Sequence, residues 1–135
     1  PANIDGAAGT VDELKLIISR IRAAWPQVNI VVRGDSGFCR EDIMSWCEVP
    51  ENNIDYLFGL AKNSRLIKEI EDELAEAKII LECSGEPSRQ FKDFRYQTLD
   101  TWSKPRRVVG KAEQIVGRSN PRFIVTSLSK EKYDA

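Results

Sequence analysis

Residues 28–38 constrain the fold of this chain most strongly, because a short apolar run stops there at a carboxylate followed by small residues. The run 30–32 is β-branched and has no polar break, which predicts a strand over 28–34 that is buried on both faces. Gly34 and Gly37 bracket Asp35 and predict the turn that ends this strand.

Asp35 has two interpretations from its position alone. Open α/β sheets place their ligands and catalytic groups at the carboxyl ends of strands, which favours a functional carboxylate. Aspartate is also frequent in turns and at helix N-caps, which favours a structural one. The position at a strand end fits both interpretations, and both remain open at this level.

Composition limits the chemistry that is available to the chain. The 135 residues, 41% hydrophobic and 30% charged, suit a single soluble globular unit. No apolar run approaches a bilayer span and no signal-peptide pattern opens the chain, so we expect a cytoplasmic protein without membrane contact. The absence of histidine excludes imidazole catalysis, and three cysteines without a Cys-x-x-Cys pair argue against a disulfide framework or zinc knuckle. Catalysis would have to use carboxylates with a hard metal ion.

The first 84 residues predict alternating helices and strands. Thr10 and Glu13 fit a capping box, and apolar residues recur at helical spacing until Trp25 and Pro26. The expected elements are a helix over 11–24, the strand 28–34, a helix over 40–48, a strand over 56–60 parallel to the first, and a long helix capped by Asn63 or Ser64 that closes at 84–87.

The C-terminal part differs in charge and pattern. Residues 1–84 hold nine Lys and Arg against fifteen Asp and Glu, whereas residues 85–135 hold eleven against six. Strand-like segments at 94–98, 107–113 and 122–128 predict a mainly antiparallel β segment. Trp102 lies among basic residues, a composition that suits stacking on bases and holding phosphates, although a buried tryptophan beside solvated charges fits equally well.

Several segments together resemble the DDE transposases of bacterial insertion sequences. The resemblance covers nearly the whole chain in the right order, and it is closest to the branch with a β-rich insertion in an RNase H-like catalytic core. The segments that carry it are Arg33-Gly-Asp-Ser-Gly-Phe38, Trp46-Cys-Glu48, Tyr56-Leu-Phe-Gly-Leu-Ala-Lys-Asn63, Phe94-Arg-Tyr-Gln-Thr-Leu-Asp-Thr-Trp102, Arg107-Val-Val-Gly-Lys-Ala-Glu113 and Asn120-Pro-Arg-Phe-Ile-Val-Thr-Ser-Leu128.

The resemblance implies an α/β fold: a partial RNase H-like core of helix, strand, helix and strand over 1–62, then a long helix and a mainly antiparallel β segment over 63–135. Asp35 matches the second Asp of the catalytic triad. The first Asp is expected upstream of Pro1 and the third carboxylate, a Glu, downstream of Ala135, so the chain resembles an internal fragment. Glu113 and Glu131 do not match the third position.

The implied activity is metal-dependent DNA cleavage and strand transfer at transposon ends. Two Mg²⁺ or Mn²⁺ ions would serve the full-length enzyme, with Asp35 as a catalytic metal ligand, whereas the fragment alone is expected to bind no metal and to be inactive. The expected partners are the terminal inverted repeats, target DNA and a second copy in a homodimer. Candidate DNA-binding residues are Arg33, Arg40, Arg95, Trp102, Lys104, Arg106, Arg107 and Lys111. An RNase H-like nuclease or resolvase and a non-catalytic α/β interaction domain remain alternatives.

Overall fold

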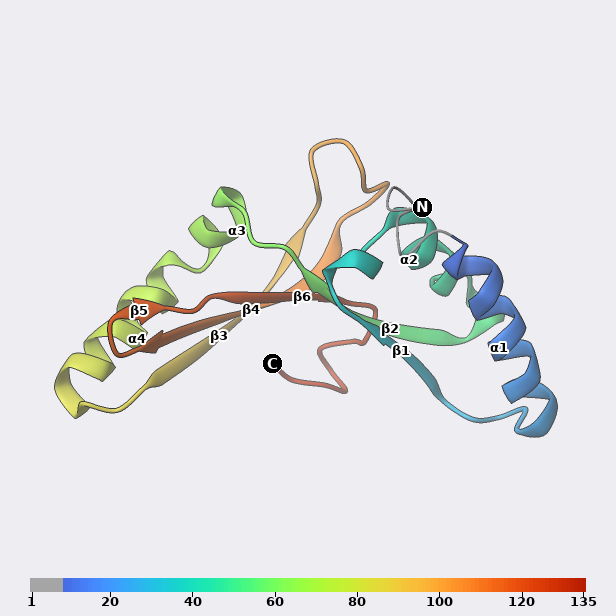
Figure 1. Ribbon diagram of the computed structural model, residues 1–135, viewed down its shortest axis with the longest axis horizontal. Coiled ribbons are helices and arrows are strands. Elements are labelled where there is room, and N and C mark those ends of the chain that lie inside the picture. The colour runs from blue at the N-terminus through green and yellow to red at the C-terminus, as the bar shows by residue number, and fades with distance from the viewer. Residues whose placement is uncertain (1–8) are drawn as a thin grey trace, which may run out of the picture.

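The computed structural model describes residues 9–135, which form a mixed α/β structure around one sheet (Figure 1). The elements in chain order are α1 (Thr10–Ala24), β1 (Ile30–Gly34), η1 (Ser36–Phe38), α2 (Glu41–Cys47), η2 (Pro50–Asn52), β2 (Ile54–Leu60), α3 (Ser64–Glu69), α4 (Glu71–Ser84), β3 (Ser88–Tyr96), β4 (Arg106–Ile115), β5 (Arg118–Ser119) and β6 (Arg122–Thr126). The expected α/β class, a helix-strand-helix-strand core followed by a mainly antiparallel segment, is confirmed.

The sheet joins both parts of the chain in the order β1-β2-β6-β4-β3, and β5 pairs with β4. β1 and β2 run parallel, as expected from the helix between them, with Ile30 opposite Ile54 and Gly34 opposite Phe58. The pairs β2·β6, β6·β4 and β4·β3 are antiparallel. The same sheet therefore runs across residue 62, and the division into 1–62 and 63–135 stays a prediction.

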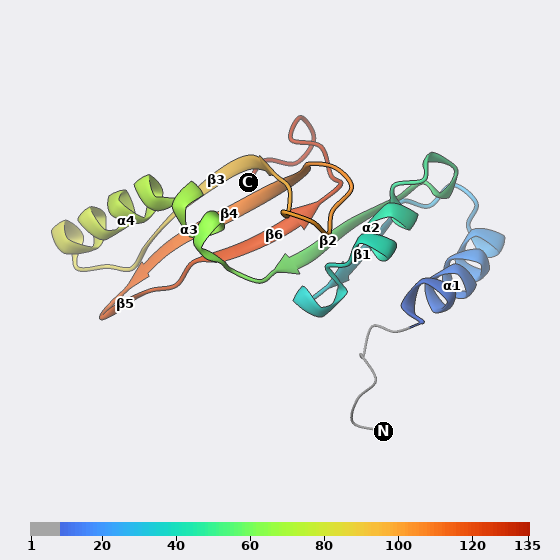
Figure 2. The same cartoon turned by 90° about the horizontal axis from the view of Figure 1, so that it is seen from above.

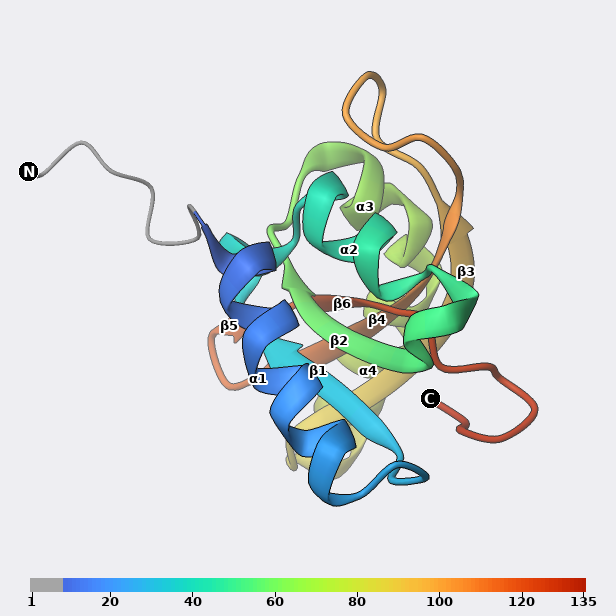
Figure 3. The same cartoon turned by 90° about the vertical axis from the view of Figure 1, so that its right-hand side faces the viewer.

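The four α-helices lie on one side of the sheet, and the C-terminal segment lies on the other (Figures 1 and 3). Seen from above, α4 lies beside β3 and β4 at one end, and α1 and α2 lie beside β1 and β2 at the other (Figure 2). The core on the helix side contains Tyr56 and Phe58, whose rings stack at 5.0 Å between centroids. Within residues 9–135, no helix combines the length and apolar character needed to cross a bilayer.

The one-sided helix layer corrects the expectation for the first strand. Val31 points to the face away from the helices and is 46% exposed, whereas Ile30 and Val32 are partly buried and pack against the core. The prediction that this strand is buried on both faces is therefore wrong for the described residues. A β-branched run reports strand propensity, but it does not show which face another layer covers.

Two helix predictions also need correction. The expected long helix is divided at Ile70, whose φ of −113° and ψ of 17° separate α3 from α4, although Asn63 caps α3 as expected by accepting a hydrogen bond from Leu66 N at 2.9 Å. Ile70 is fully buried beside Gly110, where an added Cβ would lie 2.7 Å from Ile70 Cγ2. At α1, Gly9 takes the N-cap position and no side chain caps the helix, so the capping box is not formed.

Candidate functional site

Asp35 lies in the turn directly after β1, at the carboxyl end of the two parallel strands. Its Oδ1 accepts a hydrogen bond from Gly37 N at 2.9 Å, which makes Asp35 the N-cap of η1. Its main-chain oxygen accepts another from Phe38 N at 3.1 Å. The residue is exposed, and no hydrogen bond or ion pair among residues 9–135 engages Oδ2. Asp35 therefore has the turn and N-cap role that its sequence position allows, and its Oδ2 has no partner among these described residues, so a functional role stays compatible with the structure.

Two glycines allow the turn to pack closely on the strands. A Cβ on Gly59 of β2 would lie 3.1 Å from Ser36 N and 3.3 Å from the carbonyl carbon of Asp35. A Cβ on Gly34 would lie 2.9 Å from the Cβ of Phe38. Since the first contact is with backbone that cannot rotate away, Gly59 fixes how closely the Asp35 turn approaches β2.

Cys39 follows the turn but is not equipped as a nucleophile. Its burial raises the pKa of the thiol to about 11, although Arg106 opposes part of this effect. At neutral pH the group is therefore a protonated thiol, which is weakly nucleophilic. This agrees with its partial burial against the core.

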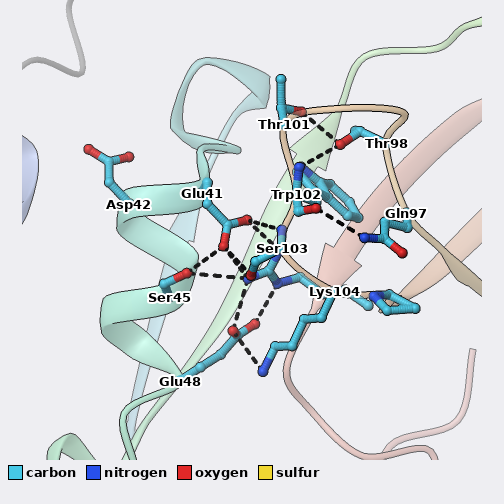
Figure 4. A network of polar contacts seen from close by, with 12 residues as sticks. Glu41, Asp42, Ser45, Glu48, Gln97, Thr98, Thr101, Trp102, Ser103 and Lys104 are labelled. Atoms are coloured by element: carbon cyan, nitrogen blue, oxygen red, sulfur yellow. Dashed lines mark hydrogen bonds and ion pairs between the residues drawn. The ribbon is translucent and has the colours of Figure 1, made fainter.

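A second polar cluster joins α2 to the start of β4 (Figure 4). Arg106 is 3% exposed, and its guanidinium binds both Glu48, at 2.6 and 3.0 Å, and Glu41, at 2.7 and 3.2 Å. Trp102 covers the guanidinium, with its ring centroid 5.5 Å from Arg106 Cζ. Tyr56 OH donates to Glu48 Oε1 at 2.7 Å. Four segments of the chain therefore meet at one buried cation.

The arginine sets the protonation of both carboxyl groups. Hydrogen bonds from Arg106 outweigh desolvation and lower the pKa of Glu41 to about 2, with further help from Ser103 and Ser45. Burial raises the pKa of Glu48, but hydrogen bonds from Arg106, Tyr56 and Lys104 exceed this effect and the pKa is lowered overall. Both groups are thus carboxylates at neutral pH.

The basic residues named from the sequence fall into two environments. Arg106 and Arg107 are buried in ion pairs; Arg107 Nε lies 2.9 Å from Asp93 Oδ2. Trp102 is 6% exposed, and its ring meets the Tyr96 ring edge-on with 5.7 Å between the centroids. This agrees with the interpretation of Trp102 as a buried tryptophan. The others reach the surface in part or fully: Arg33, Arg95 and Lys104 are exposed, and Arg40 and Lys111 are half-buried in ion pairs with Asp42 and Glu113.

The structure brings some of the exposed candidates together and leaves one apart. Arg95 and Lys104 line a polar cleft of about 800 Å³ at the end of the sheet where β2 begins and β6 ends. Arg33 lies instead at the Asp35 end of β1, two residues before the carboxylate. A phosphate backbone contacting Arg33 would therefore approach the Asp35 turn, whereas the cleft lies at the opposite end of these strands.

Comparison with known protein families matches the whole chain, residues 1–135, to the family described as Transposase DDE domain group 1. The chain belongs to this DDE transposase family. Neither curated proteins nor solved structures gave a match. Membership confirms the resemblance on which the expected transposase function rests.

The transposase chain can supply part of a metal site. The free Oδ2 of Asp35 is a hard oxygen donor of the kind that Mg²⁺ and Mn²⁺ prefer. Among residues 9–135, however, no group of three or more acidic, cysteine or histidine side chains could hold an ion together. The described residues therefore fit a divalent ion as one ligand only.

The transposase chain also contains a cluster that the sequence did not reveal. Glu41 and Glu48 are separated from Arg106 by 65 and 58 residues, and no local pattern links them. Their spacing of seven residues does place both on one side of α2, facing a common partner. That partner could be identified only after the pairing of β4 in the sheet was known.

Proposed function

We propose that Asp35 is a metal-binding catalytic carboxylate of a transposase that cleaves DNA and transfers strands at transposon ends. The observation that carries this proposal is the exposed Asp35 at the carboxyl end of parallel strands, with Oδ1 oriented by Gly37 N and Oδ2 free. Membership of the DDE transposase family supports it further.

In this proposal the chain itself positions a ligand. Gly37 N holds one oxygen, Gly59 sets the distance between the turn and β2, and the strand end presents the other oxygen to the DNA. Two divalent ions, when bound, would activate the attacking oxygen and stabilise the leaving oxygen at phosphorus. The remaining carboxylates would come from segments outside residues 1–135, and the chain alone would be inactive.

DNA contact in this proposal uses the exposed basic residues. Arg33 would hold a phosphate near the Asp35 turn, and Arg95 and Lys104 would attract DNA toward the polar cleft. Arg106 and Arg107 would instead maintain the fold, since carboxylates and main-chain oxygens already occupy their guanidinium groups. The active enzyme would be a cytoplasmic homodimer bound to the transposon ends.

The test is Asp35→Asn in the full-length protein, beside Asp42→Asn as a matched control. Asp42 is also an acidic residue that follows β1, and its side chain is 56% exposed. We expect Asp35→Asn to retain binding to transposon ends and thermal stability but to lose DNA cleavage and strand transfer in both Mg²⁺ and Mn²⁺, because the amide keeps the N-cap and loses the charge. Asp42→Asn should remain active. Excision by Asp35→Asn at a rate close to wild type would overturn the proposal.

A further inference from the structure

Helix α1 has apolar residues on two sides, and only one side is buried in the core. Val11, Leu14 and Ile18 pack against the core of the sheet. Leu16 and Ile17 point away from it and are 53% and 52% exposed. Figure 3 shows α1 along the outside of the molecule, with its outer side uncovered by any other described element.

Two opposite charges flank this exposed pair on the same side of the helix. Glu13 lies three residues before Leu16, and Arg20 lies three residues after Ile17. At 3.6 residues per turn, positions 13, 16, 17 and 20 form one stripe. Both charged side chains are exposed, and neither has an ion pair among residues 9–135. We call these four residues the outer stripe.

The order of the outer stripe is self-complementary. Reversed, the sequence acid, apolar, apolar, base becomes base, apolar, apolar, acid. Two antiparallel copies related by a two-fold axis between positions 16 and 17 would therefore place each Glu13 opposite the Arg20 of the other copy, with the apolar residues between them. Antiparallel packing also opposes the two helix dipoles. Such an isologous contact is the commonest way in which identical chains associate.

We propose that the outer stripe of α1 is the surface through which two copies of this chain associate. This deepens the homodimer part of the proposed function and rests on it, but it concerns neither metal nor catalysis. The other exposed helical apolar pair does not offer the same symmetry. Ile79 and Ile80 of α4 are 59% and 37% exposed, but α4 is acidic in its first turn and has no basic residue in its last turn.

The size of the contact predicts weak association. The surface area buried by a single pair of helices is at or below the lower limit for specific interfaces, which is about 1,200 Å². We therefore expect a dissociation constant on the order of 10–100 μM for the full chain, with the energy supplied mainly by the central apolar residues. Two flanking ion pairs that are partly exposed would chiefly select the antiparallel register.

Charge exchange tests the symmetry directly by sedimentation equilibrium of the full chain, without DNA or metal. We expect wild type to dimerise and Glu13→Arg and Arg20→Glu to be weakened at least about tenfold, because like charges then meet at both ends. The Glu13→Arg/Arg20→Glu double variant should recover. The two single variants, mixed in equal amounts, should form a heterodimer, since a stripe with two bases then meets one with two acids.

Each variant changes an exposed side chain, and circular dichroism with thermal melting controls for folding. Leu16→Gln gives a second measurement that is independent of charge and should also weaken the dimer. The inference is overturned if wild type stays monomeric at protein concentrations up to about ten times the expected dissociation constant. It is also overturned if the single variants Glu13→Arg and Arg20→Glu dimerise as tightly as wild type, or if neither the double variant nor the mixture of single variants recovers association. Such a result would not contradict the proposed catalytic role of Asp35. Conversely, an active Asp35→Asn variant would not contradict the proposed α1 contact.

Discussion

Arg106 Nε donates a 2.6 Å hydrogen bond to Glu48 Oε1 and thereby ties the first residue of β4 to the residue that follows α2. The same guanidinium holds Glu41, the first residue of α2. Both ends of this helix are therefore fixed to the strand layer through one buried cation. Since α2 follows the Asp35 turn and η1, the cluster also limits how far that turn can move.

We expect Arg106→Met to lower the free energy of unfolding by about 3 kcal/mol, because it leaves two carboxylates without their buried cation. Lys104→Met is the matched control. Lys104 also binds Glu48, at 3.0 Å, but its side chain is 56% exposed, so its loss should cost less than about 1 kcal/mol. Urea denaturation of both variants measures the difference. Equal stability of the two variants would show that the buried pairs add nothing beyond a surface pair.

The same cluster predicts a loss of stability in acid. The pKa of Glu41 is lowered in the folded state to about 2, against an ordinary value of 4.5, so folding favours the ionised form. Its contribution is fully present above about pH 4.5 and is lost as the pH falls towards 2. The lowered pKa of Glu48 acts in the same direction.

The measurement compares wild type with Glu41→Gln by urea denaturation at intervals from pH 7 to pH 2. Glu41→Gln should be less stable than wild type at pH 7, and the two curves should converge in acid. Parallel curves over the whole range would contradict the assignment. Glu51→Gln controls for the substitution itself, since Glu51 is exposed in η2.

Most helices and strands could be predicted from local sequence patterns, although the capping box at Thr10 and Glu13 was wrong, and the layers that cover these elements could not be predicted. Helical periodicity predicted α1, apolar runs predicted both parallel strands, and residue type predicted the Asn63 cap, because these features depend on residues close in the chain. The exposed Val31 and the break at Ile70 depend on which layers meet the sheet, which no local pattern records. The turn at Asp35 was found because glycine and aspartate have specific backbone roles. The Arg106 cluster was missed because its members pair over about sixty residues.

The exposed Arg33 predicts a salt-dependent contact with DNA. If Arg33 binds one phosphate, Arg33→Gln in the full-length protein should reduce the slope of log affinity against log salt by about 0.9. Arg118→Gln in the β5 hairpin is the control, because Arg118 is also exposed but is remote from Asp35 in the sheet. Fluorescence anisotropy with transposon-end DNA measures both. An unchanged slope for Arg33→Gln would make Arg33 an ordinary solvated residue.

Gly59→Ala tests whether the position of the Asp35 turn matters for activity. The added methyl would lie 3.1 Å from Ser36 N and 3.3 Å from the Asp35 carbonyl carbon, so the turn must move away from β2 by a few tenths of an ångström. We expect this overpacking to cost about 1–3 kcal/mol of stability. We also expect the Gly37 amide, which donates to Asp35 Oδ1, to change its NMR chemical shift in the 135-residue chain.

Gly110→Ala is the matched control for this substitution. It adds the same methyl to another strand of the sheet, 2.7 Å from Ile70 Cγ2, and should destabilise the fold without moving the turn. In the full-length protein, Gly59→Ala should lose more than tenfold of its DNA cleavage rate, since a small displacement of a catalytic group is costly, and Gly110→Ala should stay near wild type below its melting temperature. Equal losses in both variants would mean that activity follows stability alone, and that close packing of the Asp35 turn on β2 has no catalytic role.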